Sequence, residues 1–174
     1  MKKKLALFVT AAVVAVLVIL PATASASVTL TTKEKRVVAL INEIRADHGL
    51  AKLCVSTPLV RGARNHSSEM VAKQYFTHES YSGESFGRRL IRLGYIRTGY
   101  RYWRVGEDIA WGGGLYSTPE IVVDNWMHSV THRAVILTKN FRNIGIGVKQ
   151  CATGFGGCSS PVSFFTLDLG RRIK

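Results

Sequence analysis

The apolar residues of this chain change their spacing partway along, and that change constrains its fold more than any other feature. They recur at helical intervals of three and four residues in segments 31–49, 57–76 and 85–93. From Val105 to Ala110 the period falls to two, which is typical of a β-strand. The chain is therefore predicted to combine several helices with a sheet.

The later part of the sequence supports the same fold class. Ser117-Thr118-Pro119-Glu120 is a strong helix start, because a capping residue precedes a proline in the first turn. Two strand-like runs, 144–148 and 162–169, follow it. Helices first, then mixed elements, then a hairpin predict an α+β protein with helices packed on an antiparallel sheet.

The first 26 residues are predicted to lie outside that fold. Lys2–Lys4 precede an apolar run, Leu5–Leu20, and Ala24-Ser25-Ala26 has the form of a cleavage site, as in secretory signal peptides. A retained anchor is the alternative, but the run of 16 residues is shorter than the ~17–25 that a spanning helix needs. We expect cleavage after Ala26, an extracellular location, and a single domain over residues 27–174.

The chain is strongly basic, with 24 Lys and Arg against 11 Asp and Glu and a net charge of +13. With 47% hydrophobic residues it is not a disordered polyelectrolyte. Removal of the three lysines near the N-terminus lowers the charge to +10. We found no nucleic-acid motif, so the charge indicates either a solvated basic surface or attraction to anionic wall polymers or phospholipid.

Export would permit a disulfide. Cys151 and Cys158 enclose a glycine-rich loop between the two last strand-like runs, so we expect them to pair. Cys54 is then the odd thiol, although its pairing with either of the others stays open.

Local motifs give little catalytic signal. His128 and His132 are four residues apart, which places both imidazoles on one face of a helix. A zinc protease of the His-Glu-x-x-His type would need glutamate at the position of Ser129. His66 falls on the apolar stripe of the second predicted helix and is interpreted as a core histidine. No Gly-x-Ser-x-Gly elbow of a serine hydrolase occurs.

A dispersed set of segments is more informative. In chain order these are Asn42-Glu43-Ile44-Arg45, Phe76-Thr77-His78-Glu79-Ser80, Val105-Gly106-Glu107-Asp108-Ile109-Ala110, Trp126 to Arg133, and Asn143 to Val148. Their order and spacing resemble the CAP superfamily of cysteine-rich secretory, antigen five and pathogenesis-related proteins, in its bacterial secreted SCP-like branch. The resemblance runs from about Val37 to Leu169. It implies a three-layer α–β–α sandwich with a central antiparallel sheet and a central cleft.

In animal and plant members of that superfamily, two histidines and two acidic residues line the cleft. The resemblance places the first histidine at His78, the first acid at Glu107 and the second histidine at His132. The second acid falls on Ser129, so one carboxylate is absent and a weaker metal site is implied. Asp108 should face away from Glu107 and bind backbone or solvent.

These residues allow two arrangements. No cofactor is required, although His78 and His132 could hold a divalent metal such as zinc, with Glu107 as third ligand or as base toward a bound water. Alternatively, Glu107 hydrogen-bonds one histidine in a structural polar network.

Three functions follow from these observations. The first is a monomeric, non-enzymatic binding module whose cleft around His78, Glu107, Ser129 and His132 recognises a lipid, peptide or cell-wall polymer. The second is a metal-dependent hydrolase of peptide or envelope ester bonds, in which Glu107 is the candidate catalytic residue. The third is a cationic protein acting on anionic polymers or membranes, without specificity for nucleic acid and without a membrane span after signal cleavage.

Overall fold

The computed structural model describes residues 28–157 and 159–174. The predicted signal peptide and Cys158 lie outside the described residues. The elements, in chain order, are α1 (Thr32–Asp47), β1 (Cys54–Val55), α2 (Thr57–Lys73), α3 (Phe86–Arg92), β2 (Tyr102–Gly113), a 3₁₀ turn η1 (Gly114–Ser117), α4 (Pro119–His128), α5 (Val130–Ile136), β3 (Asn143–Cys151) and β4 (Val162–Ile173). This order confirms the predicted α+β class.

The sheet has the strand order β1-β3-β4-β2. The three long strands are antiparallel, with β4 between β3 and β2. The expected antiparallel sheet needs one correction, because β1 pairs in parallel with β3, Cys54 lying opposite Asn143. A two-residue strand is too short to give a periodic signal in the sequence. β2 is the edge strand on the other side.

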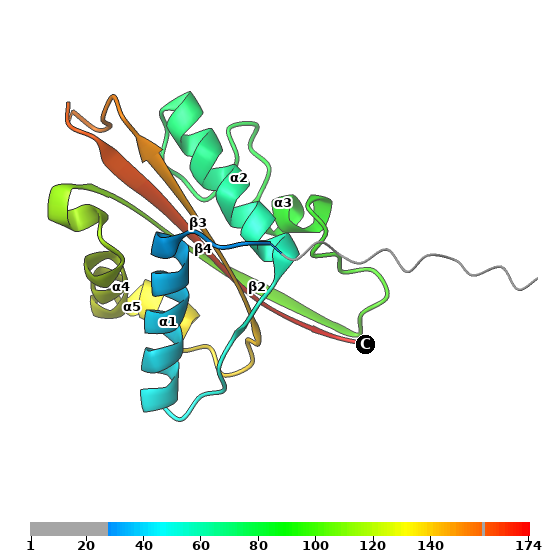
Figure 1. Ribbon diagram of the computed structural model, residues 1–174. Helices are drawn as coiled ribbons and strands as arrows, with labels where there is room; N and C mark the ends of the chain where they lie inside the picture. Colours follow the sequence, from blue (N-terminus) through cyan, green and yellow to red (C-terminus); the bar gives the residue numbers. More distant parts are fainter. Residues whose placement is uncertain (1–27, 158) are drawn as a thin grey trace, which may run out of the picture.

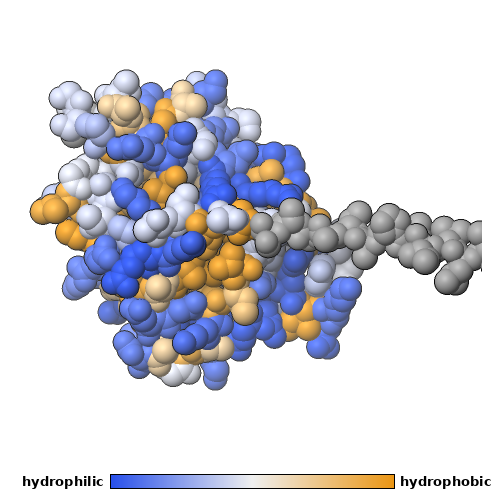
Figure 2. Space-filling model, in the orientation of Figure 1, coloured by the Kyte–Doolittle hydropathy of each residue, from blue (hydrophilic) through white to orange (hydrophobic). Residues whose placement is uncertain are grey.

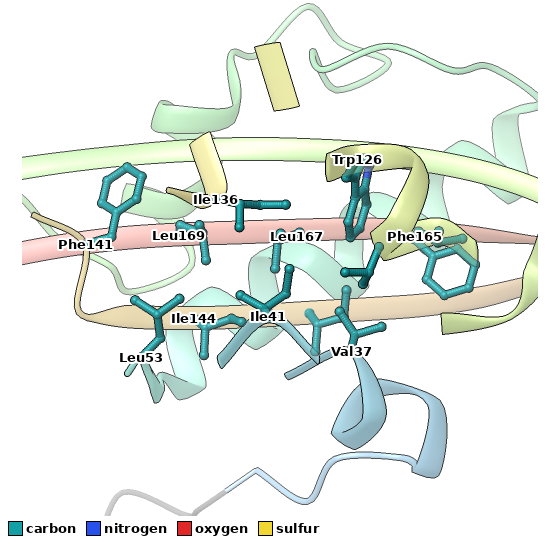
Figure 3. Packing of buried hydrophobic residues seen from close by; sticks show 13 residues of the cluster. Val37, Ile41, Leu53, Trp126, Ile136, Phe141, Ile144, Phe165, Leu167 and Leu169 are labelled. Carbon is teal, nitrogen blue, oxygen red and sulfur yellow. The ribbon is translucent and has the colours of Figure 1, made fainter. Parts of the chain in front are cut away.

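Helices cover both faces of the sheet, α2 and α3 on one and α1, α4 and α5 on the other (Figure 1). This is the expected three-layer sandwich. The larger core cluster lies between the sheet and α1, α4 and α5, as Figure 3 shows; it includes Val37, Ile41, Trp126, Ile136, Phe141, Ile144, Phe165, Leu167 and Leu169. Two smaller clusters, one around Met70 and Phe164 and one around Leu59, Leu90 and Tyr95, lie on the face of α2 and α3.

Two glycines of β3 let α2 lie directly on the sheet. A Cβ atom at Gly145 would come within 2.2 Å of the backbone carbon of Leu59, and one at Gly147 within 2.3 Å of the backbone carbon of Ala63. Distances this short do not occur between real atoms, so any side chain at either position would push the helix away. The Gly-Ile-Gly run is therefore a packing feature rather than part of a nucleotide site.

The helix starts agree with the capping signals. Thr31 and Glu34 form a capping box at α1, and Glu34 also forms an ion pair with Arg64 of α2 at 2.5 Å. The expected single helix through His128 and His132 is wrong. Ser129 has an extended backbone and both ends α4 and begins α5, so the two histidines lie on different helices.

Arg45 of α1 is fully buried and binds only backbone carbonyls. Its guanidinium donates to the oxygens of Ile136 at 2.6 Å and Thr138 at 3.1 Å, which lie at the end of α5 and just beyond it. It also donates to Ala51 at 3.1 Å. Because the last carbonyls of a helix lack partners within the helix, Arg45 acts as a C-terminal cap supplied by another helix.

The predicted disulfide between Cys151 and Cys158 is not seen. Cys151 is buried with a free thiol, its Sγ 3.0 Å from the carbonyl oxygen of Gly154, while Cys158 lies outside the described residues. Cys54 is an exposed free thiol on β1. Neither described cysteine is therefore cross-linked in this structure.

Candidate functional site: a histidine–glutamate pair on the edge strand

Glu107 lies in the middle of β2 with a side chain that is 0% exposed. Its Oε2 forms a short ion pair with Arg89 of α3, which is also fully buried. Its Oε1 accepts a hydrogen bond from Nδ1 of His78 at 2.9 Å. Arg89 further donates to the carbonyl of His78 at 3.2 Å and to Oγ of Ser80 at 3.0 Å. Both oxygens of Glu107 are thus occupied by protein donors.

The bond to Glu107 sets the chemistry of His78. Because Nδ1 donates to a carboxylate, Nε2 is the ring nitrogen left for other partners. The same bond raises the pKa of His78, and it outweighs the partial burial that acts in the opposite direction. The His78 side chain is 44% exposed, so an imidazole whose cationic form is favoured is accessible from outside at the edge of the sheet.

His132 comes to the same site from the opposite layer. It lies on α5, where partial burial, and then the nearby charge of His78, lower its pKa. The pKa values of the two imidazoles are therefore shifted in opposite directions, that of His78 upward and that of His132 downward.

The other two candidates near His132 do not join this pair. Ser129 is partly exposed at the junction of α4 and α5, and its Oγ lies 3.2 Å from Oγ1 of Thr131. His128 is exposed on α4, where its Nδ1 is 2.9 Å from the carbonyl oxygen of Asp124. The structure therefore places His78 and Glu107 in contact, brings His132 within electrostatic range, and leaves Ser129 bound to its own turn.

Two further buried charged residues, Asp168 and Arg89, lie next to Glu107, and neither was predicted from the sequence. Asp168 of β4 is directly opposite Glu107, fully buried, and its two oxygens have no hydrogen-bond partner among the described residues. Burial and then the charge of Glu107 raise its pKa. The other missed residue is Arg89. A signal existed for both, since Arg89 lies on the apolar stripe of its helix and Asp168 interrupts a long apolar strand.

His66 behaves as the sequence predicted. It is fully buried on α2, and its Nε2 donates to the carbonyl of Thr77 at 2.8 Å. Burial lowers its pKa, so the ring is neutral and serves to hold the segment that leads to His78.

Asp108 corrects a prediction. It faces away from Glu107 as expected, but it is buried rather than open to solvent. The residue is 1% exposed, and its Oδ2 has no hydrogen-bond partner among the described residues. Burial, followed by the charge of Glu107, raises the pKa of Asp108 to about 8. The carboxyl is therefore largely neutral at pH 7.

The residues present do not fit the predicted zinc site. Within the described part of the chain, no group of three or more His, Cys, Asp and Glu side chains is arranged to hold a metal ion. Glu107 is poorly placed to serve as a third ligand, because its side chain is fully buried and is held by His78 and Arg89. Catalytic zinc sites use three protein ligands, and this site offers two imidazoles at most.

Residues 38–168 match the sequence profile of the cysteine-rich secretory protein family, CAP. The match covers most of the 174 residues, and the chain belongs to this family. It is 38% identical over 125 residues to the uncharacterized protein YkwD of Bacillus subtilis (strain 168), covering 72% of this chain and 46% of that protein. It is 35% identical over 120 residues to the uncharacterized membrane protein YlbC of the same strain, covering 69% of this chain and 32% of that protein. The chain thus spans less than half the length of these relatives.

Solved structures show the same fold. An extracellular protein containing an SCP domain from Bacillus anthracis str. Ames superposes with a TM-score of 0.63 at 25% identity, over 83% of this chain and 45% of that one. An outer surface protein from Borrelia burgdorferi superposes with a TM-score of 0.60 at 19% identity, over 79% and 91% of the two chains. In the described part of this chain, we find no helix with the length and apolarity that a membrane span requires.

Proposed function

We propose that this chain is an extracellular, non-catalytic binding module whose ligand contacts His78 and His132 at the edge of β2. The observation that carries the proposal is the double occupation of the Glu107 carboxylate by Arg89 and His78. A general base needs a free lone pair within reach of a substrate proton. The Glu107 side chain is fully buried and already bonded to His78 and Arg89, so it does not reach a substrate proton and its role is to orient and charge His78.

The two histidines suit an anionic or hydrogen-bonding ligand. The raised pKa of His78 favours its cationic form, which donates from both ring nitrogens, whereas the lowered pKa of His132 favours the neutral ring, with a donor on one nitrogen and an acceptor on the other. A carboxylate or phosphate of an envelope peptide or wall polymer would bind His78 through a charge-assisted hydrogen bond. The predicted signal peptide supports encounter of such a ligand outside the cell.

The test is binding to purified cell walls of Bacillus subtilis, the organism of both curated relatives. We expect the double variant His78→Ala, His132→Ala to lose at least about tenfold in affinity, because a hydrogen bond to a charged group exceeds 1.4 kcal/mol. His128→Ala is the matched control, since it removes an exposed imidazole from α4 that lies outside the site. Unchanged binding of the double variant would place the ligand elsewhere.

A zinc titration by calorimetry separates this proposal from the hydrolase. Stoichiometric zinc uptake by the unaltered chain, abolished in the double variant, would favour metal chemistry over simple binding. We expect no such uptake, because Glu107 is not free to complete a three-ligand site.

A further inference from the structure

Three arginines from three adjacent segments lie in a line across one end of the sheet. Arg104 of β2 is the register partner of Arg171 of β4. On the other side of β4, the backbone N–H of Arg142 donates to the carbonyl of Gly170 at 3.0 Å, one residue before β3 begins. In Figure 1 the beginning of β2 lies beside the end of β4. We call Arg104, Arg171 and Arg142 the arginine row.

The row lies on the sheet face covered by α5. The guanidinium of Arg104 is 5.9 Å from the ring centre of Phe141, which belongs to the core cluster of that face. Partners in an antiparallel pair point to the same face, so Arg171 lies there too. Arg172, the next residue, points to the other face and stacks on Tyr95 at 4.2 Å. Neighbouring strands are about 4.8 Å apart, so the backbone positions of the row lie side by side.

Nothing in the described structure neutralises this row. Among residues 28–157 and 159–174, no ion pair joins a carboxylate to Arg104, Arg171 or Arg142. The guanidinium of Arg142 instead donates to the carbonyls of Lys139 and Phe141, each at 2.7 Å. A further cation, Arg45, is close enough for Arg142 to lower its pKa, after the larger effect of burial.

Such an arrangement opposes folding. Like charges on directly opposite residues of a strand pair are destabilising. The exposed acids on α1 and α4, the two longer helices of this face, are Glu43, Asp47, Glu120 and Asp124, and the described structure shows no ion pair between any of them and the row. Figure 2 shows hydrophilic residues over much of the visible surface. A hydrophilic surface can be built from positive and negative side chains together, so it does not explain three neighbouring arginines. An anionic partner would relieve the repulsion on binding.

We propose that the arginine row binds a linear, phosphate-bearing polymer. Guanidinium groups match phosphate oxygens in pairs of parallel hydrogen bonds, and a line of closely spaced cations matches a chain of repeated anions. Arg171 and Arg142 are only partly exposed, whereas Arg104 is exposed. A thin chain can reach partly exposed side chains that a flat membrane surface would not. The row contains none of the residues of the histidine site, and Arg104 lies three positions before Glu107 on β2.

The experiment measures binding of inorganic polyphosphate to the full chain by calorimetry between 50 and 200 mM salt. The test variant is Arg104→Gln with Arg171→Gln. The matched control is Lys35→Gln with Arg61→Gln, which removes the same charge from exposed positions on α1 and α2. We expect the test variant to lose about tenfold or more in affinity. Its affinity should also depend less on salt: the negative slope of log affinity against log salt should become shallower by about 1.4, which is about 0.7 for each lost arginine. The control should bind like the unaltered chain.

Folding is checked on the same samples. Because the test variant removes a like-charge pair, its midpoint of thermal unfolding should equal or exceed that of the unaltered chain. Equal loss of binding in test and control variants would overturn the proposal, since net charge alone would then explain binding. Binding to vesicles with 30% anionic phospholipid but not to polyphosphate would also overturn it, in favour of a membrane surface.

Discussion

Replacement of Arg89 by methionine tests the arrangement on which the candidate site depends. Arg89 and Glu107 both have fully buried side chains, and Arg89 is the only guanidinium that the described structure pairs with Glu107. The variant would leave a buried carboxylate without its cation, and it would also free the hydrogen-bonding groups of Ser80 and His78. Breaking a buried pair in this way costs about 3–5 kcal/mol of unfolding free energy.

Urea unfolding at pH 7, followed by tryptophan fluorescence, measures that loss. Glu107→Gln provides the reciprocal variant, and the double variant completes a thermodynamic cycle. We expect the double variant to recover much of the loss, because replacing both partners of a buried pair is often nearly neutral. A coupling free energy under about 1 kcal/mol would refute the role of Arg89 as the counterion of Glu107.

Three further predictions concern packing and titration. Gly145→Ala should lower the unfolding free energy by about 3 kcal/mol in urea unfolding, because its Cβ would meet the backbone of Leu59 at 2.2 Å; Gly87→Ala, whose nearest new contact is 3.5 Å, should change it by at most about 1 kcal/mol and in the stabilising direction. His78→Gln should destabilise the protein more at pH 5.5 than at pH 8.5. The folded state raises the pKa of His78, so its bond contributes stability below the unfolded pKa of about 6.5 that is lost as the pH rises. An equal loss of stability at pH 5.5 and pH 8.5 would be evidence against the bond to Glu107. Asp108→Asn should raise the unfolding free energy at pH 7–8 by roughly 1–3 kcal/mol. The folded state raises the pKa of this carboxyl to about 8, so the unaltered chain loses stability as the pH rises from about 4 to 8. The variant should lack this pH dependence in thermal unfolding.

Local signals in the sequence predicted most of the elements. The Thr31–Glu34 capping box and the Thr118-Pro119 start lie where helices begin in the structure, because a cap depends only on residues within one turn. The break at Ser129 was not predicted, since serine is also tolerated within helices. β1 was missed because its pairing with β3 depends on contacts far along the chain.

The site was predictable only in part. The order of five segments that resemble the CAP superfamily pointed to His78, Glu107 and His132. It did not reveal that both oxygens of Glu107 accept bonds from other side chains. That fact depends on Arg89, whose approach to Glu107 requires α3 to fold over the edge strand. The opposition of Asp168 and Glu107 likewise requires the register of β2 and β4. Such pairings arise from tertiary packing. The partners are too far apart in the sequence to form a local motif, so they cannot be recognised from the sequence alone.

The carbonyl cap that Arg45 gives to α5 has a consequence for the dynamics of the site. A seven-residue helix is marginal by itself, so α5 depends on contacts outside its own turns. Because Arg45 belongs to α1, opening of α5 must break bonds to a helix that is 91 residues away from Ile136 in sequence. We expect the amides of α1 and α5 to exchange with deuterium as one cooperative unit. Position 132 would then be no more mobile than the core helix that holds it, and His132 would meet a ligand without first being ordered.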